Sequence, residues 1–156
     1  MTCVIWRIAV EAPEYAANDL SGTGAKMTGG LWNSAGTPMV YCSANIALAA
    51  LETLSFIRTG SLPFNRYLVR VEVPDDIWNM RETPNPLPVN WDAVPSGLTS
   101  RKAGDDWIAS RRTPLLEVPS VIIPDECNIL INPLHPAIAR ITATIVRRWM
   151  HDPRFF

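Results

Sequence analysis

The chain has 156 residues, a net charge of −1 at pH 7 and 47% hydrophobic residues, a composition typical of one compact domain. A chain of this length buries roughly 68–70% of the surface that its unfolded form exposes, enough for a core without disulfides or a structural metal. The near-zero net charge gives no electrostatic basis for direct binding of nucleic acid. We therefore expect a single domain over residues 1–156 that does not contact nucleic acid.

Cysteine usage and hydropathy indicate a cytoplasmic protein. The three cysteines, Cys3, Cys42 and Cys127, are an odd number with no CxxC spacing, which argues against a disulfide framework and against a zinc site. We expect them to be small buried side chains in a reducing compartment, and we expect no metal. Charged residues interrupt the first apolar run, and the uncharged stretch 27–51 is too rich in Gly, Pro, Ser, Thr and Asn to cross a bilayer. The sequence therefore predicts neither a secretory signal nor contact with a membrane.

Short apolar runs and two helical segments alternate along the chain, separated by loops rich in Gly and Pro. In chain order we expect a strand at 4–8, a loop at 29–38, a strand at 39–42, a helix at 45–57, a strand at 67–73, a loop at 79–98, a helix at 100–110, and short strands at 115–118, 120–123 and 127–131. Ser43 is expected to cap the first helix, and Trp107 and Ile108 to face inward from the second. The pattern predicts an α+β fold in one domain.

Glu52 is the charged residue in the most unusual position. No charged side chain occurs between Lys26 and Glu52, and Glu52 falls in the first predicted helix with Leu48 and Ala49 one turn before it. Its carboxylate should therefore project among apolar groups, where a charge is costly unless it is paired or takes part in chemistry. The alternative is a position at the edge of the apolar face from which the carboxylate reaches water.

The loop before that helix has the composition of a ligand-binding turn. Gly29 and Gly30 let the backbone approach a ligand closely and adopt conformations that other residues disfavour. Asn33 is expected to fix the turn through its own side-chain hydrogen bonds. Trp32 is expected to pack in the core more than to recognise a ligand.

The segment from Gly29 to Glu52, GGLWNSAGTPMVYCSANIALAALE, resembles the signature of the RES-domain family, toxins of bacterial type II toxin–antitoxin systems. That signature has Gly-x-Arg-Trp-Asn, then Gly-x-Pro-x-x-Tyr, then a helix that ends in Leu-Glu. Later segments are similar to further family motifs: Gly104-Asp105-Asp106-Trp107, Val118-Pro119-Ser120, and Glu126 to Pro133 followed by His135-Pro136. The matches keep their order from Trp6-Arg7 to Asp152-Pro153-Arg154, so the resemblance covers essentially the whole chain.

The resemblance implies a fold, a reaction and a partner. The fold is a single α+β RES domain over residues 1–156, with a split β-sheet like that of the ADP-ribosyltransferase toxins and short helices around a cleft that holds NAD. The reaction is cleavage of the nicotinamide–ribose bond of NAD, either by phosphorolysis with inorganic phosphate or by hydrolysis. The partner is a cognate antitoxin with a helix-turn-helix DNA-binding domain.

One residue departs from the family pattern. The arginine, glutamate and serine that give the family its name fall at position 31, Glu52 and Ser120, and position 31 is leucine in this chain. The departure predicts impaired catalysis on an unchanged fold.

The implied chemistry assigns roles to three catalytic candidates. Cleavage of an N-glycosidic bond to a cationic nicotinamide passes through an oxocarbenium-like state, so Glu52 near the ribose would stabilise the developing positive charge. Tyr41 would form one wall for nicotinamide or donate its hydroxyl, unless it only packs in the core. Ser120 would bind phosphate or ribose and not act as a nucleophile, because neither His135 nor His151 lies at a recognisable triad spacing.

Five residues are expected to contact the NAD substrate: Arg7, Gly30, Leu31, Trp32 and Asn33. Arg7 is a lone cation in an apolar strand, which suits a pyrophosphate contact or, equally, an internal ion pair. If Leu31 removes a phosphate contact, Arg7 or Lys26 offers a replacement cation.

Two other functions are compatible with the sequence. With Leu31 in place, the chain could bind NAD or a partner without turning NAD over. It could also be an ADP-ribosyltransferase that modifies a macromolecule, although no acceptor site is visible. For an antitoxin we expect an interface over the cleft entrance, since arginine suits protein interfaces, and the anchoring residues would be Arg111, Arg112, Arg147 and Arg148.

Overall fold

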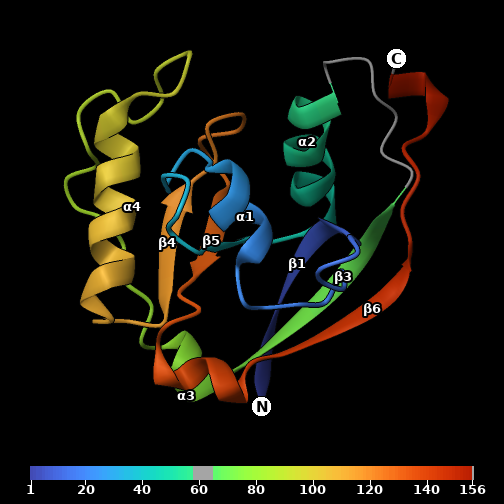
Figure 1. Ribbon diagram of the computed structural model, residues 1–156, viewed down its shortest axis with the longest axis horizontal. Helices are drawn as coiled ribbons and strands as arrows, with labels where there is room; N and C mark the ends of the chain where they lie inside the picture. The colour runs from blue at the N-terminus through green and yellow to red at the C-terminus, as the bar shows by residue number, and fades with distance from the viewer. Residues whose placement is uncertain (58–64, 156) are drawn as a thin grey trace.

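The computed structural model describes residues 1–57 and 65–155, and in these residues it contains a sheet and several short helices (Figure 1). The strands are β1 (Thr2–Val10), β2 (Val40–Ser43), β3 (Arg66–Pro74), β4 (Leu115–Pro119), β5 (Cys127–Ile131) and β6 (Thr142–Arg148). The helices are α1 (Thr23–Thr28), α2 (Ile46–Ile57), α3 (Asp75–Trp78), α4 (Leu98–Ser110) and the short 3-10 helices η1 (Pro136–Arg140) and η2 (Pro153–Phe155). Figure 1 shows α4 beside β4 and β5, α2 near β1, and α1 between these two helices.

The six strands within the described residues form one antiparallel sheet in the order β4-β5-β2-β1-β3-β6. Its two halves meet at β1 and β2, which are paired only where Trp6 lies opposite Ser43. By contrast, β1 and β3 pair along their whole length, from Thr2 opposite Pro74 to Val10 opposite Arg66. The two strands therefore separate beyond Trp6 along β1, over the part of β2 that precedes Ser43, and the expected α+β fold with a split sheet is confirmed.

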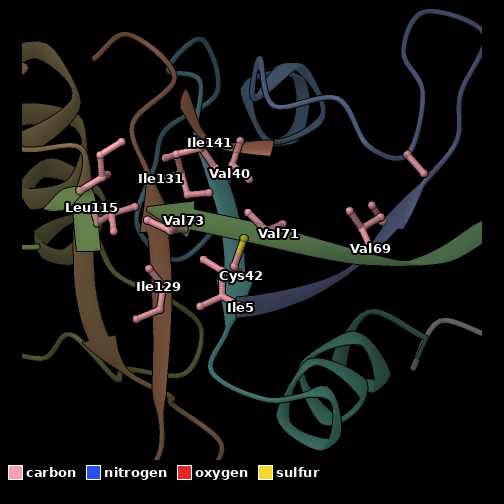
Figure 2. Packing of buried hydrophobic residues seen from close by; sticks show 13 residues of the cluster. Ile5, Val40, Cys42, Val69, Val71, Val73, Leu115, Ile129, Ile131 and Ile141 are labelled. Atoms are coloured by element: carbon pink, nitrogen blue, oxygen red, sulfur yellow. The ribbon is translucent and has the colours of Figure 1, made fainter. Parts of the chain in front are cut away.

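One face of the sheet carries the main apolar core. Alternate residues of β1, β3 and β5 point to this face, because side chains on a strand alternate between the two faces of a sheet. Figure 2 shows Ile5 and Val71 packed near Cys42, and Ile129 and Ile131 beyond it. Val69, Val71 and Val73 are fully buried, whereas Arg70 between them is exposed, as the alternation in the sequence predicts.

The first predicted helix is present, but Ser43 does not cap it. Asn45 immediately precedes α2, and its side-chain oxygen accepts a hydrogen bond from the backbone N–H of Leu48 at 2.8 Å. Asn45 therefore satisfies one of the unpaired donors of the first turn. Ser43 instead ends β2, where its hydroxyl donates to Asn128 at 2.7 Å.

The second predicted helix is confirmed as α4, with Trp107 and Ile108 3% and 1% exposed. The predicted loop at 79–98 contains no helix or strand as far as residue 97, within the described part of the chain. The predicted strand at 120–123 is wrong. There the Ser120 hydroxyl accepts hydrogen bonds at 3.1 Å from the backbone N–H groups of Ile122 and Ile123, which closes a turn between two prolines.

The cysteines are unpaired, but the prediction that all three are buried holds only for Cys42, because Cys3 and Cys127 are partly exposed. Burial raises the pKa of the Cys42 thiol to about 12, although the nearby charge of Arg7 opposes that rise. Among the helices of residues 1–57 and 65–155, none combines the length and the apolar character needed to cross a bilayer.

Candidate functional site

A cavity of about 560 Å³ opens where β1 and β2 separate. Its wall is made by the second half of β1, by β2, by α2, by the segment around α1, and by the loops at 93–96 and after β4. This volume falls within the range of roughly 300–1,000 Å³ that is usual for small-molecule sites. Of the residues expected at the site, six line the cavity: Arg7, Gly30, Leu31, Trp32, Tyr41 and Glu52.

The carboxylate of Glu52 is held by side chains from two other segments. Its Oε1 accepts hydrogen bonds from the Ser120 hydroxyl at 2.6 Å and from the Asn128 amide at 2.8 Å. Asn128 in turn accepts a hydrogen bond from the Ser43 hydroxyl. A charge on an apolar helix flank is thus compensated by charge-assisted hydrogen bonds, which are shorter and stronger than neutral ones. Glu52 is a partly exposed carboxylate on the cavity wall that is held by hydrogen bonds.

Ser120 lies behind Glu52 and does not line the cavity. The residue is 0% exposed, and its hydroxyl donates to Glu52 while accepting from the two backbone N–H groups of the turn. With its donor and acceptor capacity in use, Ser120 has no free group for phosphate or ribose. The geometry therefore supports a positioning role in place of the expected substrate contact.

The hydroxyl of Tyr41 holds the glycine loop. It donates to the side-chain oxygen of Asn33 at 2.6 Å and accepts from the backbone N–H of Trp32 at 3.0 Å. The Asn33 amide donates to the carbonyls of Ala25 and Thr37, both at 2.9 Å, which fixes the turn as its sequence predicts. Asn33 is 0% exposed and does not line the cavity. Both residues therefore shape the loop that forms the wall.

The hydrogen bond between Tyr41 and Asn33 leaves room only for glycine at position 30. A Cβ at Gly30 would lie 2.8 Å from the Tyr41 hydroxyl and 3.0 Å from the Asn33 side-chain oxygen. Any larger residue would displace the hydroxyl from the loop. Burial raises the pKa of Tyr41 above its ordinary value, so the hydroxyl stays protonated and able to donate.

The helix α4 supports the same loop from the other side. The Ser100 hydroxyl donates to the carbonyl of Leu31 at 2.8 Å, and Asp105 accepts from the backbone N–H of Ser34 at 2.9 Å. A Cβ at Gly104 would lie 1.6 Å from the carbonyl oxygen of Trp32, so only glycine lets the loop backbone pack onto the helix. The Gly-Asp-x-Trp motif thus holds the loop in place, a role that its sequence did not reveal.

Leu31 and Trp32 differ in how far they reach the cavity. Trp32 is 2% exposed and stacks on Trp91 with ring centroids 6.2 Å apart, in agreement with the packing role expected for it. Leu31 is half-buried, lines the cavity and packs against the apolar cluster that contains Trp32 and Met39. An apolar side chain therefore occupies the loop position where the motif has a cation.

Within the part of the chain that the structure describes, two arginines line the cavity. Arg7 comes from β1 and Arg66 from the start of β3, and the Nε of each is buried with no hydrogen-bond partner among the described residues. Among the described residues, Arg7 is in no ion pair with a carboxylate. This favours the phosphate contact over the internal ion pair, the two roles that the sequence left open for Arg7. Arg66 was not found by sequence reasoning, because nothing near it in the chain distinguishes it from the other arginines.

Within residues 1–57 and 65–155, no group of three or more His, Cys, Asp or Glu side chains is placed to hold a metal ion. The described residues offer the carboxylates of Glu52 and Asp19, the guanidinium groups of Arg7 and Arg66 and a largely apolar wall, which can bind an anionic molecule and stabilise positive charge that develops on it.

The chain is similar to known proteins over nearly its whole length. The sequence model of the RES domain family matches residues 4–153 of this chain. A relative from Sphingobium sp. (strain YBL2), named "Prs ADP-ribosylating toxin", is 53% identical over 156 residues, which are 99% of this chain and 97% of the relative. A protein of Yersinia enterocolitica named "Toxin Res" is 31% identical over 152 residues, 97% of this chain and 98% of that protein.

A solved structure shows the same fold at low sequence identity. The crystal structure of the M. tuberculosis MbcT-MbcA toxin-antitoxin complex contains a chain that matches with a TM-score of 0.65 and 14% identity. The match covers 94% of this chain and 85% of that chain. The family model spans nearly the whole sequence, and so do relatives above 30% identity. The chain therefore belongs to the RES domain family.

Proposed function

We propose that the chain is the toxin of a toxin–antitoxin pair and that it cleaves the nicotinamide–ribose bond of NAD. The observation that carries this proposal is the carboxylate of Glu52, fixed by Ser120 and Asn128 on the wall of a largely apolar cavity. The names of the relatives from Sphingobium and Yersinia, both toxins, support the biological part. We propose that the whole chain acts as one RES domain.

In the proposed reaction, the bond between nicotinamide N1 and ribose C1′ breaks and its electron pair stays on N1, which neutralises the pyridinium. The ribose becomes oxocarbenium-like, and Glu52 stabilises the positive charge that develops there. Tyr41 and the loop from Gly29 to Ser34 form the facing wall, and Arg7 binds a substrate phosphate. Neutral nicotinamide leaves, an acceptor oxygen forms a bond to C1′, and the proton of that oxygen passes to solvent.

The acceptor is the point on which two candidate functions differ. Inorganic phosphate or water as acceptor gives NAD phosphorolysis or hydrolysis. A macromolecular acceptor gives ADP-ribosyl transfer, and this second function is favoured by the Sphingobium relative, which is named for ADP-ribosylation of Prs and is 53% identical to this chain. Both functions need the same first step and the same carboxylate.

Nicotinamide release from NAD tests the shared step. Purified protein and its Leu31→Arg version would be incubated with NAD in the presence and absence of inorganic phosphate, and nicotinamide would be quantified. We expect release by the Leu31→Arg protein at least. If neither protein releases nicotinamide or binds NAD at millimolar concentration, the proposal is wrong.

Label transfer from NAD separates the acceptors. With NAD labelled in its adenylate half, label in a phosphorylated ADP-ribose product would identify phosphate, and label in free ADP-ribose would identify water. Label that stays with macromolecules of a cell lysate, or with purified Prs, would identify transfer. The matched control is Glu52→Gln, which should abolish whichever product forms.

We also propose an antitoxin over the cavity mouth. Val94 and Val121 both line the cavity and are exposed, 94% and 37%, so a partner seated there would bury apolar surface and block entry. The expected arginine anchors do not form one surface. Arg111 and Arg112 follow α4 on the β4 side, whereas Arg147 and Arg148 lie on β6 at the opposite edge of the sheet (Figure 1).

Co-expression with the neighbouring reading frame, followed by size exclusion, tests the antitoxin. Val94→Asp should weaken co-elution. Val89→Asp is the matched control, because Val89 is 75% exposed on the same loop but does not line the cavity. Separate elution of the wild-type proteins at micromolar concentration would contradict the proposed complex.

A further inference from the structure

Arg66 is an unusual cation for its place in the fold. It opens β3, reaches the cavity, and has a buried Nε with no hydrogen-bond partner within the part of the chain that the structure describes. The sequence of residues 58–64, RTGSLPF, contains no Asp or Glu, so that segment offers it no carboxylate either. Burial lowers the pKa of Arg66, as expected for a guanidinium that loses water without gaining an anion.

Several other arginines of the described residues are paired with carboxylates. Among the described residues, five arginines lie within hydrogen-bond or ion-pair distance of a carboxylate: Arg70, Arg81, Arg112, Arg140 and Arg154. None of the five lines the cavity, whereas Arg7 and Arg66 line it and lack such a pair. A half-buried unpaired cation is costly in the free protein, so its presence is best explained by an anion that arrives as a ligand.

The register of β1 and β3 separates Arg66 from Arg7. Val10 lies opposite Arg66, and Arg7 lies opposite Val69, so the two arginines are three positions apart on the ladder, on the order of 10 Å. Because successive side chains on a strand point to opposite faces, the side chains of Arg7 and Arg66 leave the sheet on opposite faces. Arg66 shares its face with Leu68, which packs with Ala49 of α2, the helix that carries Glu52.

Within the described residues, no carboxylate lies at ion-pair distance from Arg66. His151 is a titratable neighbour of Arg66, and burial together with the charge of Arg66 lowers the pKa of His151. Two carboxylates of the described residues line the cavity with Arg66. Glu52 accepts hydrogen bonds from Ser120 and Asn128, and Asp19 accepts one from Ser21.

We propose that Arg66 forms an anion-binding position on the α2 side of the cavity, separate from Arg7, and that this position takes a phosphate group. The group is either a phosphate of the dinucleotide substrate or the inorganic phosphate that serves as acceptor. The inference rests on the proposed function, because it places a second phosphate contact beside the carboxylate that acts on the ribose. Arginine suits this task, since its planar fork donates two parallel hydrogen bonds to phosphate oxygens.

Ligand affinity and thermal stability of Arg66→Met and Arg66→Lys test the proposal. The matched control is Arg70→Met on the same strand, where the guanidinium is exposed and paired with Glu72. The probes are NAD, inorganic phosphate and adenosine, with affinities measured by calorimetry. We expect Arg66→Met to weaken phosphate-containing probes about ten- to a hundred-fold, because a hydrogen bond to a charged group is lost. Adenosine binding should not change, and Arg66→Lys should restore part of the affinity.

The melting temperature supplies the second readout. Without ligand, Arg66→Met should melt at the same temperature as the wild type or higher, because the unpaired cation is gone, whereas a structural arginine would give a lower value. If Arg66→Met loses affinity for NAD alone, the phosphate bound by Arg66 belongs to the dinucleotide. If it loses affinity for inorganic phosphate, the group bound by Arg66 is the inorganic phosphate acceptor. Unchanged affinity of Arg66→Met for both probes, or a wild-type protein that binds neither, overturns the proposal.

The outcomes separate this proposal from the function proposed above. If NAD is turned over equally by the wild type and Arg66→Met, with unchanged affinities, only the role of Arg66 is wrong. If inorganic phosphate binds through Arg66 but NAD neither binds nor reacts, the phosphate position stands and NAD cleavage is wrong.

Discussion

Ser120 donates a hydrogen bond of 2.6 Å to Glu52 although the two residues are 68 positions apart in the sequence. The same hydroxyl accepts two backbone N–H groups of the turn after β4, so the turn, the hydroxyl and the carboxylate form one rigid unit. Asn128 adds a second donor to the same carboxylate oxygen. The orientation of the Glu52 carboxylate is thus set by Ser120, which does not line the cavity, and by Asn128, which does.

Glu52→Gln in the Leu31→Arg protein should lower NAD turnover by at least ~10²-fold and leave NAD affinity within a few-fold. The reason is that the carboxylate interacts mainly with charge that exists in the transition state. The kcat and the dissociation constant would be measured separately. Glu126→Gln, in an exposed side chain near the same turn, should change neither value. Equal losses in binding and in rate would instead assign Glu52 to ground-state binding.

Ser120→Ala should lower turnover about ten-fold without abolishing it, because the hydroxyl orients Glu52 and does not attack the substrate. It should also cost about 1–3 kcal/mol of stability, since two backbone N–H groups lose their acceptor. A double-mutant cycle is decisive. In the Glu52→Gln background, Ser120→Ala should have little further effect on rate, and an independent additional loss there would contradict a role through Glu52.

Tyr41→Phe should act through the loop. The substitution leaves the Trp32 N–H without its acceptor and Asn33 without its donor, so we expect a loss of about 1–3 kcal/mol in denaturant unfolding and a raised KM for NAD. Tyr67→Phe is the control, because its hydroxyl forms no hydrogen bond within residues 1–57 and 65–155. A fall in kcat with unchanged stability and KM would show that the Tyr41 hydroxyl takes part in the chemistry.

The ion pair of Glu82 with Arg112 predicts a pH dependence of stability. The Arg112 guanidinium beside Glu82 holds the pKa of that carboxyl below its usual range, so the pair stabilises the protein above the unfolded pKa of about 4.3 and the contribution is lost as the pH falls through the lowered value. Glu82→Gln should therefore cost at most ~1 kcal/mol near pH 7, since Arg112 is 58% exposed. The difference from wild type should shrink below pH ~4, and a difference that grows there would contradict the assignment.

The fold was predictable where the chain repeats a simple pattern. The alternation in β3 and the helix formers of α2 are local signals, and both elements occur where they were expected. The strand prediction at 120–123 was wrong because a short apolar run between Pro119 and Pro124 is compatible with either a strand or a turn. Two backbone N–H groups donate to the Ser120 hydroxyl, and these hydrogen bonds stabilise the turn. β6 was not predicted, because an exposed edge strand carries little hydrophobic alternation.

The site was predictable only in part, because its contacts join distant segments. Glu52 stood out as a charge among apolar neighbours, and the glycine loop by its composition. Arg66 has neither signal, since its distinguishing feature is a missing partner in the folded protein. Asn128 belongs to a motif, but its hydrogen bond to Glu52 depends on the pairing of β2 with β5. Sequence motifs thus identified residues, and the structure is needed to tell substrate contacts from supports.

Leu31→Arg should raise NAD turnover by about ten- to a hundred-fold. Leu31 lines the cavity in the loop held by Tyr41 and Ser100, so an arginine there would reach a substrate phosphate or ribose with charge-assisted hydrogen bonds of ~1.5–3 kcal/mol each. The loop would not have to move, because Ser100 binds the carbonyl of residue 31 and not its side chain.

Growth and cellular NAD after induction from a tightly controlled promoter would measure the effect in cells, and nicotinamide release would measure it in vitro. Leu31→Met is the control, since methionine keeps the apolar contacts and adds no donor. The Leu31→Arg protein combined with Glu52→Gln should lose the gain, because the new cation only binds the substrate on which the carboxylate acts. If the Leu31 protein and its Leu31→Arg version turn over NAD equally, the leucine is not what limits activity, and the cations already in the cavity, Arg7 and Arg66, are sufficient to hold the substrate.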